Sequence, residues 1–289
     1  MKIGIIGFSE SVKEILENTR RLSFTGYYIS GNTTADSDIK ESLEEYSSSR
    51  ELIDQSDILL INGDPEAFEI AKNAIKTSTH LLFDTPFLFS EKEFNDLFEL
   101  AHENNVLLKF NQKILHKDVY KKISSSQEPD LIKFRADIPN NKDIKSIQER
   151  VLFEFASILR DNIKSGIRKI NISKDKQSGK YFSLTIHLDN DSNCELIYNT
   201  IASEKHIYLE LFYPNRLVSL DFMSDKMISR NQKGTKTKGA NQKSNLMKQE
   251  LEDFKTQLSK IKSMPITIRE ENQYLLYFTY RLAEKAFRS

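Results

Sequence analysis

Short apolar runs alternate with amphipathic stretches along the first third of the chain. Most of these runs are apolar at nearly every position, which is typical of parallel strands buried on both faces. Between them, apolar residues recur at helical spacing, so the pattern predicts an α/β, doubly wound parallel sheet. The predicted strands cover residues 3–6, 26–30, 57–61, 80–83 and 106–110.

Two of the intervening helices have clear local signals. Between the third and fourth strands, Ala67, Ile70 and Ala74 fall on one helical face. Between the fourth and fifth, Ser90 is followed three residues later by Glu93, which is the spacing of a capping box. We therefore expect helices on both sides of the strand at 80–83.

The pattern changes near residue 114. A helix is predicted over 113–123, then an alternating strand at 131–136 and an amphipathic helix at 149–163. Five further strands are predicted at 168–172, 181–188, 194–201, 206–212 and 216–222, and two helices at 246–261 and 271–287. Short turns between successive strands favour an open antiparallel sheet. Two domains follow: residues 1–115, Rossmann-like, and residues 116–289, α+β.

Residues 232–245 contain a single apolar residue, Ala240. We predict a mobile, solvated loop. The alternative is a phosphate- or partner-binding role for its lysines, Lys233, Lys236, Lys238 and Lys243.

Composition narrows the class of protein. The chain has 289 residues, with 42 Lys plus Arg against 42 Asp plus Glu, so no overall charge favours nucleic acid or an anionic membrane. Cys194 is the single cysteine and cannot form an internal disulfide. No apolar run approaches the ~20 residues of a membrane helix, and no signal peptide is seen. We expect a cytoplasmic protein.

Four segments carry a family resemblance: residues 3–7 (IGIIG), 57–61 (DILLI), 80–86 (HLLFDTP) and 251–254 (LEDF). In this order and spacing they resemble the glucose–fructose oxidoreductase/inositol dehydrogenase (Gfo/Idh/MocA) family along nearly the whole chain. The resemblance implies a Rossmann domain that binds NAD or NADP, a sheet domain for substrate binding and dimerisation, and a sugar-like substrate. The strands at 181–188 and 206–222 indicate a homodimer or homotetramer through that sheet.

The resemblance places five residues at the turn that would hold the cofactor pyrophosphate: Gly7, Phe8, Ser9, Glu10 and Ser11. Gly7 keeps the tight turn, but Ser9 replaces the glycine that permits close approach of the phosphates. Glu10 adds a negative charge near a helix N-terminus. Ser11 and Glu14 have the spacing of a capping box. Two interpretations stay open, a reshaped cofactor turn and a self-capped helix without ligand.

Other positions of the resemblance are also altered. The implied cofactor contacts beyond the turn are Asn32, Asn62, Gly63, Asp84, Thr85 and Pro86. Asn32 falls where the family has an acid for the ribose hydroxyls. Thr85 stands where the family has a Lys that assists proton transfer, and it carries no charge. Phe153 stands where the family has a His.

Three residues of the predicted helix at 113–123 are substitute catalytic candidates. Lys113 follows Asn111, which echoes the family's Asn and Arg, and His116 and Tyr120 are four apart and would share a helix face. The alternative is an ordinary amphipathic helix with a surface His and Lys. Glu154 is the ionisable residue beside the position of the family's His. The histidines lack metal-ligand spacing, so no metal site is predicted.

Three functional hypotheses follow. The first is an NAD(P)-dependent oxidoreductase acting on a sugar or polyol carbonyl or hydroxyl. The second is a catalytically inactive member, a pseudoenzyme that senses a ligand or binds a protein, because the turn, ribose, Lys and His positions are all changed at once. The third is a member resembling the compact biliverdin reductases, which reduce a tetrapyrrole.

Overall fold

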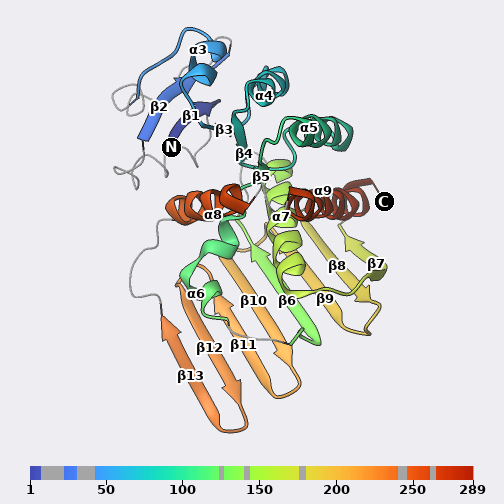
Figure 1. The fold of residues 1–289 in the computed structure, drawn as a ribbon. Coiled ribbons are helices and arrows are strands. Elements are labelled where there is room, and N and C mark those ends of the chain that lie inside the picture. The colour runs from blue at the N-terminus through green and yellow to red at the C-terminus, as the bar shows by residue number, and fades with distance from the viewer. Residues whose placement is uncertain are drawn as a thin grey trace. The chain divides into compact units, whose positions relative to one another are not determined.

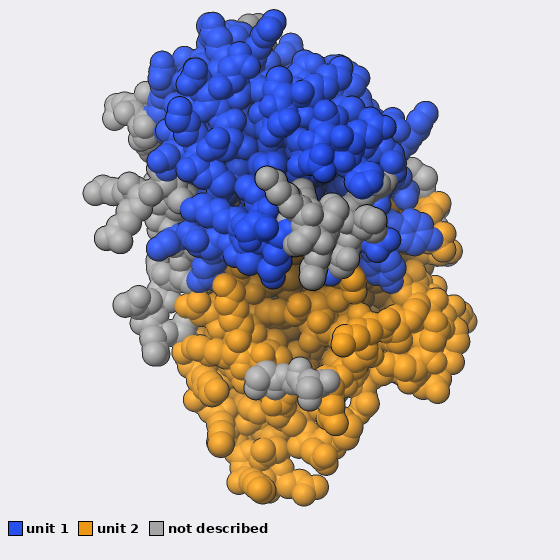
Figure 2. Space-filling view, in the orientation of Figure 1, with its two compact units in different colours: residues 1–111, 245–277 blue, residues 112–244, 278–289 orange. Residues whose placement is uncertain are grey.

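A computed structural model describes residues 1–7, 23–30, 43–123, 127–139, 144–175, 180–239, 246–260 and 265–288. The chain divides into two compact units (Figure 2). Unit 1 comprises residues 1–111 and 245–277, and unit 2 comprises residues 112–244 and 278–289. Each unit therefore combines segments that are distant in the sequence. The domain boundary after residue 115 stays a prediction.

Unit 1 contains a five-stranded parallel sheet in the order β2-β1-β3-β4-β5 (Figure 1). Its strands are β1 Lys2–Ile6, β2 Ser23–Tyr28, β3 Ile58–Ile61, β4 His80–Phe83 and β5 Leu108–Phe110. Every neighbouring pair is parallel. The doubly wound sheet expected from the apolar runs is confirmed.

Four helices of unit 1 are α3 Ser49–Asp54, α4 Ala67–Lys76, α5 Glu91–Glu103 and α8 Leu246–Lys260. The capping box of α5 is confirmed: the Ser90 hydroxyl accepts from the Glu93 N–H at 3.2 Å, and the Glu93 carboxylate accepts from the Ser90 N–H at 2.7 Å. Each residue's side chain thus accepts from the other residue's backbone N–H, and these two hydrogen bonds fix the start of the helix.

Two sets of side chains form the core of unit 1. Phe83 and Phe110 of the sheet surround Phe94 of α5, with ring centroids 5.2 and 5.1 Å from it. Leu251 and Phe254 of α8 belong to a second cluster of buried residues. Its other members are Ile3, Ile58, Leu60, Leu82 and Leu107. A helix from the last sixth of the chain thus completes the core of the N-terminal sheet.

Unit 2 contains an eight-stranded mixed sheet in the order β13-β12-β11-β10-β6-β9-β8-β7. The strands are β6 Leu131–Asp137, β7 Ile167–Lys174, β8 Tyr181–Leu188, β9 Asn193–Asn199, β10 His206–Tyr213, β11 Arg216–Asp221, β12 Lys226–Asn231 and β13 Gly234–Gly239. All neighbouring pairs are antiparallel except β6 and β9, which are parallel. The predicted open, mostly antiparallel sheet is confirmed.

Helix α7, Ile144–Asn162, packs on one face of this sheet against β6 and β9 (Figure 1). Helix α9, Pro265–Arg288, spans the boundary between the two units in the sequence. None of the helices in the described part of the chain is long and apolar enough to cross a membrane.

The two faces of the large sheet differ in character. Apolar side chains at alternate positions, such as Leu184 and Leu209, are buried within unit 2. The opposite face is mixed: Lys133 and Glu195 form an ion pair there at 3.5 Å, and the apolar Ile197 and Phe212 are partly exposed on the same face. Homo-oligomerisation through the sheet stays a prediction.

The helix predicted over 113–123 is wrong. The segment forms a short 3-10 helix, η1 Lys113–His116, and a single turn, α6 Asp118–Lys121. Lys117 between them is extended, with φ −61° and ψ 134°, and its ammonium donates to the carbonyl of Phe222 at 2.9 Å. This long-range contact accompanies the break in the helix, so His116 and Tyr120 do not share a helix face.

The loop predicted over 232–245 is also wrong in part. Strands β12 and β13 pair as an antiparallel hairpin, with Arg230 opposite Thr235. Backbone hydrogen bonds between strands need no apolar side chains, so the hydrophobic pattern gave no sign of it. Lys233, Lys236 and Lys238 are exposed on this hairpin, where lysines oppose pairing with another sheet edge. Lys243 lies outside the described residues.

Candidate functional site

Gly7 forms the turn at the carboxyl end of β1. Its φ is +72°, and an added Cβ would lie 3.0 Å from the Cβ of Asp64 and 3.1 Å from the carbonyl carbon of Gly63. The Gly7 N–H donates to the carbonyl of Tyr28 at 3.0 Å. The backbone conformation and the close approach of the loop after β3 both require glycine here.

The loop after β3 joins the ends of the first three strands. The Asp64 carboxylate accepts from the N–H and the hydroxyl of Ser30, at 2.9 and 2.7 Å, and from the Glu66 N–H at 2.9 Å. Asn62 is buried, and its N–H donates to the carbonyl of Ile6 at 2.9 Å. Gly63 is exposed, and an added Cβ there would meet only the Leu88 side chain, at an ordinary contact distance of 4.0 Å. Asp64 is an acidic group of this edge, beside Asp84, that the sequence did not single out as a contact.

Asp84, Thr85 and Pro86 follow β4, and Asn111 follows β5. The Asn111 amide donates to the Asp84 carboxylate at 3.3 Å. The Thr85 hydroxyl accepts from the Phe87 N–H at 3.3 Å. Asp84 and Thr85 are partly exposed, whereas Pro86 is buried.

Asn111 has an unsatisfied acceptor at this edge. It is 3% exposed, and its side-chain oxygen has no hydrogen-bond partner among the described residues. A buried polar atom of this kind requires an explanation, and a bound ligand is one. Ligands of open parallel sheets bind outside the carboxyl ends of the strands, where this oxygen lies. The edge therefore fits a dinucleotide whose carboxamide can donate a hydrogen bond.

Several predicted cofactor contacts lie outside the described residues: Phe8, Ser9, Glu10, Ser11 and Asn32. The two interpretations of the turn after β1 therefore both stay open. Of the predicted set, Gly7, Asn62, Gly63, Asp84, Thr85 and Pro86 all lie at the carboxyl edge of the unit 1 sheet.

In unit 2, Glu154 of α7 lies within electrostatic range of several cations. Burial raises the pKa of the Glu154 carboxyl, and the attraction of Arg150, Lys205, Lys117 and Lys113 opposes this rise without cancelling it. A carboxyl whose pKa is raised toward neutrality is suited to general acid–base chemistry. The structure thus brings the candidate Lys113 within electrostatic range of Glu154.

The other candidates of unit 2 are buried. His116 on η1 is 8% exposed and Phe153 on α7 is 4% exposed. The Lys113 ammonium is inaccessible to solvent. Phe153 offers no proton donor, so the neighbouring Glu154 is the ionisable group at this turn of α7.

Tyr120 has a different environment. Its hydroxyl donates to the Asp161 carboxylate at 2.7 Å and accepts from the Asn162 amide at 2.7 Å. Burial, reinforced by Asp161, raises the pKa of Tyr120 well above its usual value of 10. This hydroxyl remains protonated and engaged with α7, which argues against a proton-transfer role.

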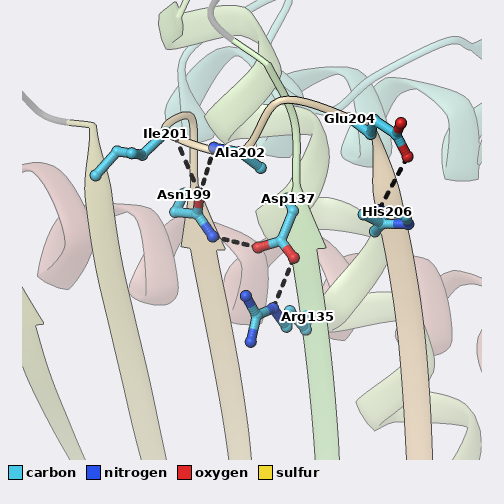
Figure 3. Close-up of polar contacts among 7 residues, drawn as sticks. All are labelled: Arg135, Asp137, Asn199, Ile201, Ala202, Glu204 and His206. Atoms are coloured by element: carbon cyan, nitrogen blue, oxygen red, sulfur yellow. Dashed lines mark hydrogen bonds and ion pairs between the residues drawn. The ribbon is translucent and has the colours of Figure 1, made fainter.

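Polar side chains gather at three neighbouring strand ends of the large sheet, and hydrogen bonds among them join β6 to β9 (Figure 3). Asp137 of β6 accepts from the Arg135 Nε at 2.7 Å and from the Asn199 amide. The Asn199 oxygen accepts in turn from the N–H groups of Ile201 and Ala202, at 3.1 and 3.2 Å. His206 of β10 lies 3.8 Å from Glu204. The Asp137 carboxylate is engaged by two donors, so this cluster stabilises the strand ends.

Comparisons with known proteins identify the fold. No protein-family model matches the chain, and no curated protein matches it in sequence. Among solved structures, UDP-N-acetylglucosamine 3-dehydrogenase GnnA from Acidithiobacillus ferrooxidans is similar, with a TM-score of 0.83 at 15% identity, covering 100% of this chain and 99% of that chain.

Two further similar structures hold bound ligands. An inositol dehydrogenase homolog from Azotobacter vinelandii, complexed with NADH and myo-inositol, has a TM-score of 0.75 at 8% identity and covers 100% and 96% of the two chains. Biliverdin reductase from Synechocystis, complexed with biliverdin and NADP+, has a TM-score of 0.72 at 15% identity and covers 100% and 99%. The fold is that of Gfo/Idh/MocA-type dehydrogenases, as the resemblance implied.

Proposed function

We propose that this chain is an NAD(P)-dependent oxidoreductase acting on a carbonyl or hydroxyl group of a sugar or polyol. The observation that carries the proposal is the fold, which matches sugar and polyol dehydrogenases over at least 96% of both chains. Fold alone is an analogy for activity, so the residues of each unit have to supply the chemistry.

Unit 1 supplies the cofactor site of the proposal. Gly7 and Gly63 give a backbone edge without side chains, and Asp84 and Thr85 are partly exposed beside it. The buried Asn111 oxygen is an acceptor for a carboxamide N–H. A nicotinamide dinucleotide, when bound, supplies or removes the hydride. These residues bind and orient it.

Unit 2 supplies the proposed proton-transfer group, Glu154. A substrate carbonyl oxygen that becomes a hydroxyl takes up one proton, and the Glu154 carboxyl can give it. In the opposite direction the carboxylate takes the proton from the hydroxyl. The raised pKa of Glu154 keeps a larger protonated fraction near neutral pH than an exposed Glu has. Lys113 stabilises the carboxylate that remains.

The inactive alternative rests on a specific observation. The Thr85 hydroxyl, which accepts from the Phe87 N–H, is not an acid near neutral pH, and Phe153 is a buried phenyl ring, so neither position has the proton-transfer group that the resembled family has there. Under this alternative the fold binds a ligand or a partner protein without turnover.

Binding and turnover separate the two. The purified protein is first tested for carried-over cofactor and then titrated with NADH and NADPH by calorimetry. Micromolar dissociation constants, followed by NAD(P)-linked conversion of UDP-N-acetylglucosamine or myo-inositol, support the oxidoreductase. Binding without conversion of any sugar, polyol or biliverdin favours the inactive form. No binding at millimolar nucleotide contradicts the proposed cofactor.

The proposed residue is tested by Glu154→Gln, which keeps the side chain's size and removes its proton transfer. We expect turnover to fall ~10²–10⁴-fold with unchanged NADH affinity. The matched control is Glu195→Gln on β9, whose carboxylate pairs with Lys133 on the polar face of the sheet. Equal turnover in both variants would assign proton transfer to another group.

A further inference from the structure

Unit 2 contains a pocket of about 600 Å³. None of the residues proposed for the reaction lies in its lining. Four segments form it: the η1–α6 segment, the residues before β6, the end of α7 and the end of β10. The lining side chains are Leu115, Tyr120, Lys121, Ile123, Gln127, Glu128, Asp161, Asn162, Lys164 and Tyr213. This volume lies within the range of small-molecule sites.

The pocket is lined mainly by hydrogen-bonding groups of balanced charge. The lining has two carboxylates, two ammonium groups, two side-chain amides and two phenols. Opposite charges in equal number give no net preference for an anion or a cation. Carboxylates accept and amides donate, and a sugar hydroxyl does both. The chemistry favours an uncharged polyhydroxylated molecule.

Several of these groups are already held in place. Tyr120, 6% exposed, is fixed by Asp161 and Asn162, each at 2.7 Å. The Glu128 carboxylate accepts from the Lys164 N–H at 2.8 Å and from the Asn190 amide at 2.9 Å. Positioned polar groups lose little entropy when a ligand binds.

One carboxylate oxygen is left for a ligand. Asp161 is exposed, and its Oδ2 accepts from Tyr120. Its Oδ1 has no hydrogen bond among the described residues and can accept from a hydroxyl. We propose that this pocket is a second binding site, for an uncharged sugar or polyol, distinct from the group around Glu154.

The site has a structural route to the proposed reaction group. Tyr120 belongs to α6, which packs against η1, and η1 carries Lys113, one of the cations that act on Glu154. A sugar bound beside Tyr120 would restrain this segment.

The test uses the full chain and two sugar probes, N-acetylglucosamine and myo-inositol, followed by saturation-transfer NMR and calorimetry. Gln127→Trp places a large side chain at the exposed rim and leaves the buried hydrogen bonds intact. Asp161→Ala removes the proposed acceptor. We expect each to weaken sugar binding ~tenfold or more.

Two control variants keep this proposal distinguishable from the proposed function. Lys169→Trp puts the same bulk on exposed β7 and is expected to bind sugar like the wild type. Glu154→Gln is also expected to retain binding at the pocket, whatever its turnover. The proposal is overturned if neither sugar binds at millimolar concentration, if inorganic phosphate binds in their place, or if Glu154→Gln abolishes binding while Gln127→Trp and Asp161→Ala do not.

Discussion

The Lys109 ammonium of β5 lies 2.7 Å from the Glu250 carboxylate of α8, and neither side chain is more than 2% exposed. Asp253, one helical turn further along α8, pairs with the same ammonium. Burial disfavours the charged form of Lys109, but the two carboxylates outweigh it and raise the pKa of this lysine. The triad therefore joins α8 to the sheet through charge as well as through apolar packing.

Lys109→Met is expected to destabilise the protein strongly, because it leaves Glu250 buried without its counter-charge. Breaking a buried pair from one side typically costs about 3–5 kcal/mol in the free energy of unfolding. Urea denaturation measures this. Lys133→Met, which breaks the half-exposed pair with Glu195, is the matched control and should cost about 1 kcal/mol or less. Similar losses in both variants would mean that the buried triad contributes no more than a surface pair.

The pKa of Glu154 predicts a pH dependence of stability. A folded-state pKa raised above the ordinary 4.5 means that the folded chain holds this proton more tightly than the unfolded chain does. The stabilisation is present below pH 4.5 and is lost as the pH rises through the raised value. Gln has no carboxyl to titrate, so the variant does not lose this stabilisation. The free energy of unfolding of Glu154→Gln, minus that of the wild type, should therefore be larger at neutral pH than below pH 4.5.

Chemical denaturation at several pH values checks this. If the stability of Glu154→Gln runs parallel to that of the wild type over this range, the pKa of the Glu154 carboxyl is not raised, and its proposed role in proton transfer loses its physical basis.

Gly7→Ala should lower the free energy of unfolding by about 1–3 kcal/mol. A side chain at φ +72° is strained, and its Cβ would be 3.0 Å from the Cβ of Asp64. NADH affinity should fall with it. Gly239→Ala is the control, because an added Cβ there meets nothing within 4 Å. Thermal unfolding and NADH titration measure both variants. Unchanged NADH affinity in a folded Gly7→Ala protein would separate this turn from cofactor binding.

Thr85→Lys is expected to give no gain in turnover of a sugar or polyol. It restores the charge that the family resemblance places after β4, but Phe153 remains without a proton donor. The measurement is NAD(P)-linked turnover of myo-inositol, with Thr85→Met as the control for side-chain length. A clear gain of turnover in Thr85→Lys but not in Thr85→Met would show that a single positive charge at this position is enough to restore activity.

Local signals predicted the parts of the fold that depend on neighbouring residues. Four consecutive apolar residues mark β3, and Ser90 with Glu93 marks the start of α5. The local signals failed where contacts with distant residues determine the backbone conformation. Lys117 is extended and bonded to the carbonyl of Phe222, which interrupts a segment of helical spacing.

The same limit applies to the candidate site. Thr85 and Phe153 could be identified from the sequence as altered positions. Lys109 could not be identified as part of an ion triad, because Asp253 is 144 residues further along the chain. Glu154 was visible as an ionisable residue one helical turn from Arg150, but its other cationic neighbours, Lys113 of η1, Lys117 just before α6 and Lys205 just before β10, are joined to it by no local pattern.

Helix α8 has a consequence for the order in which the protein folds during synthesis. Leu251 and Phe254 complete the cluster that contains Ile3, Leu60 and Leu82, yet all of residues 112–244 are made before them. A ribosome-bound chain ending at residue 244 would present that apolar surface of the parallel sheet to water. The core of unit 1 is therefore completed only after residues 112–244 of unit 2 have been synthesised, and the nascent chain is exposed to aggregation in the interval.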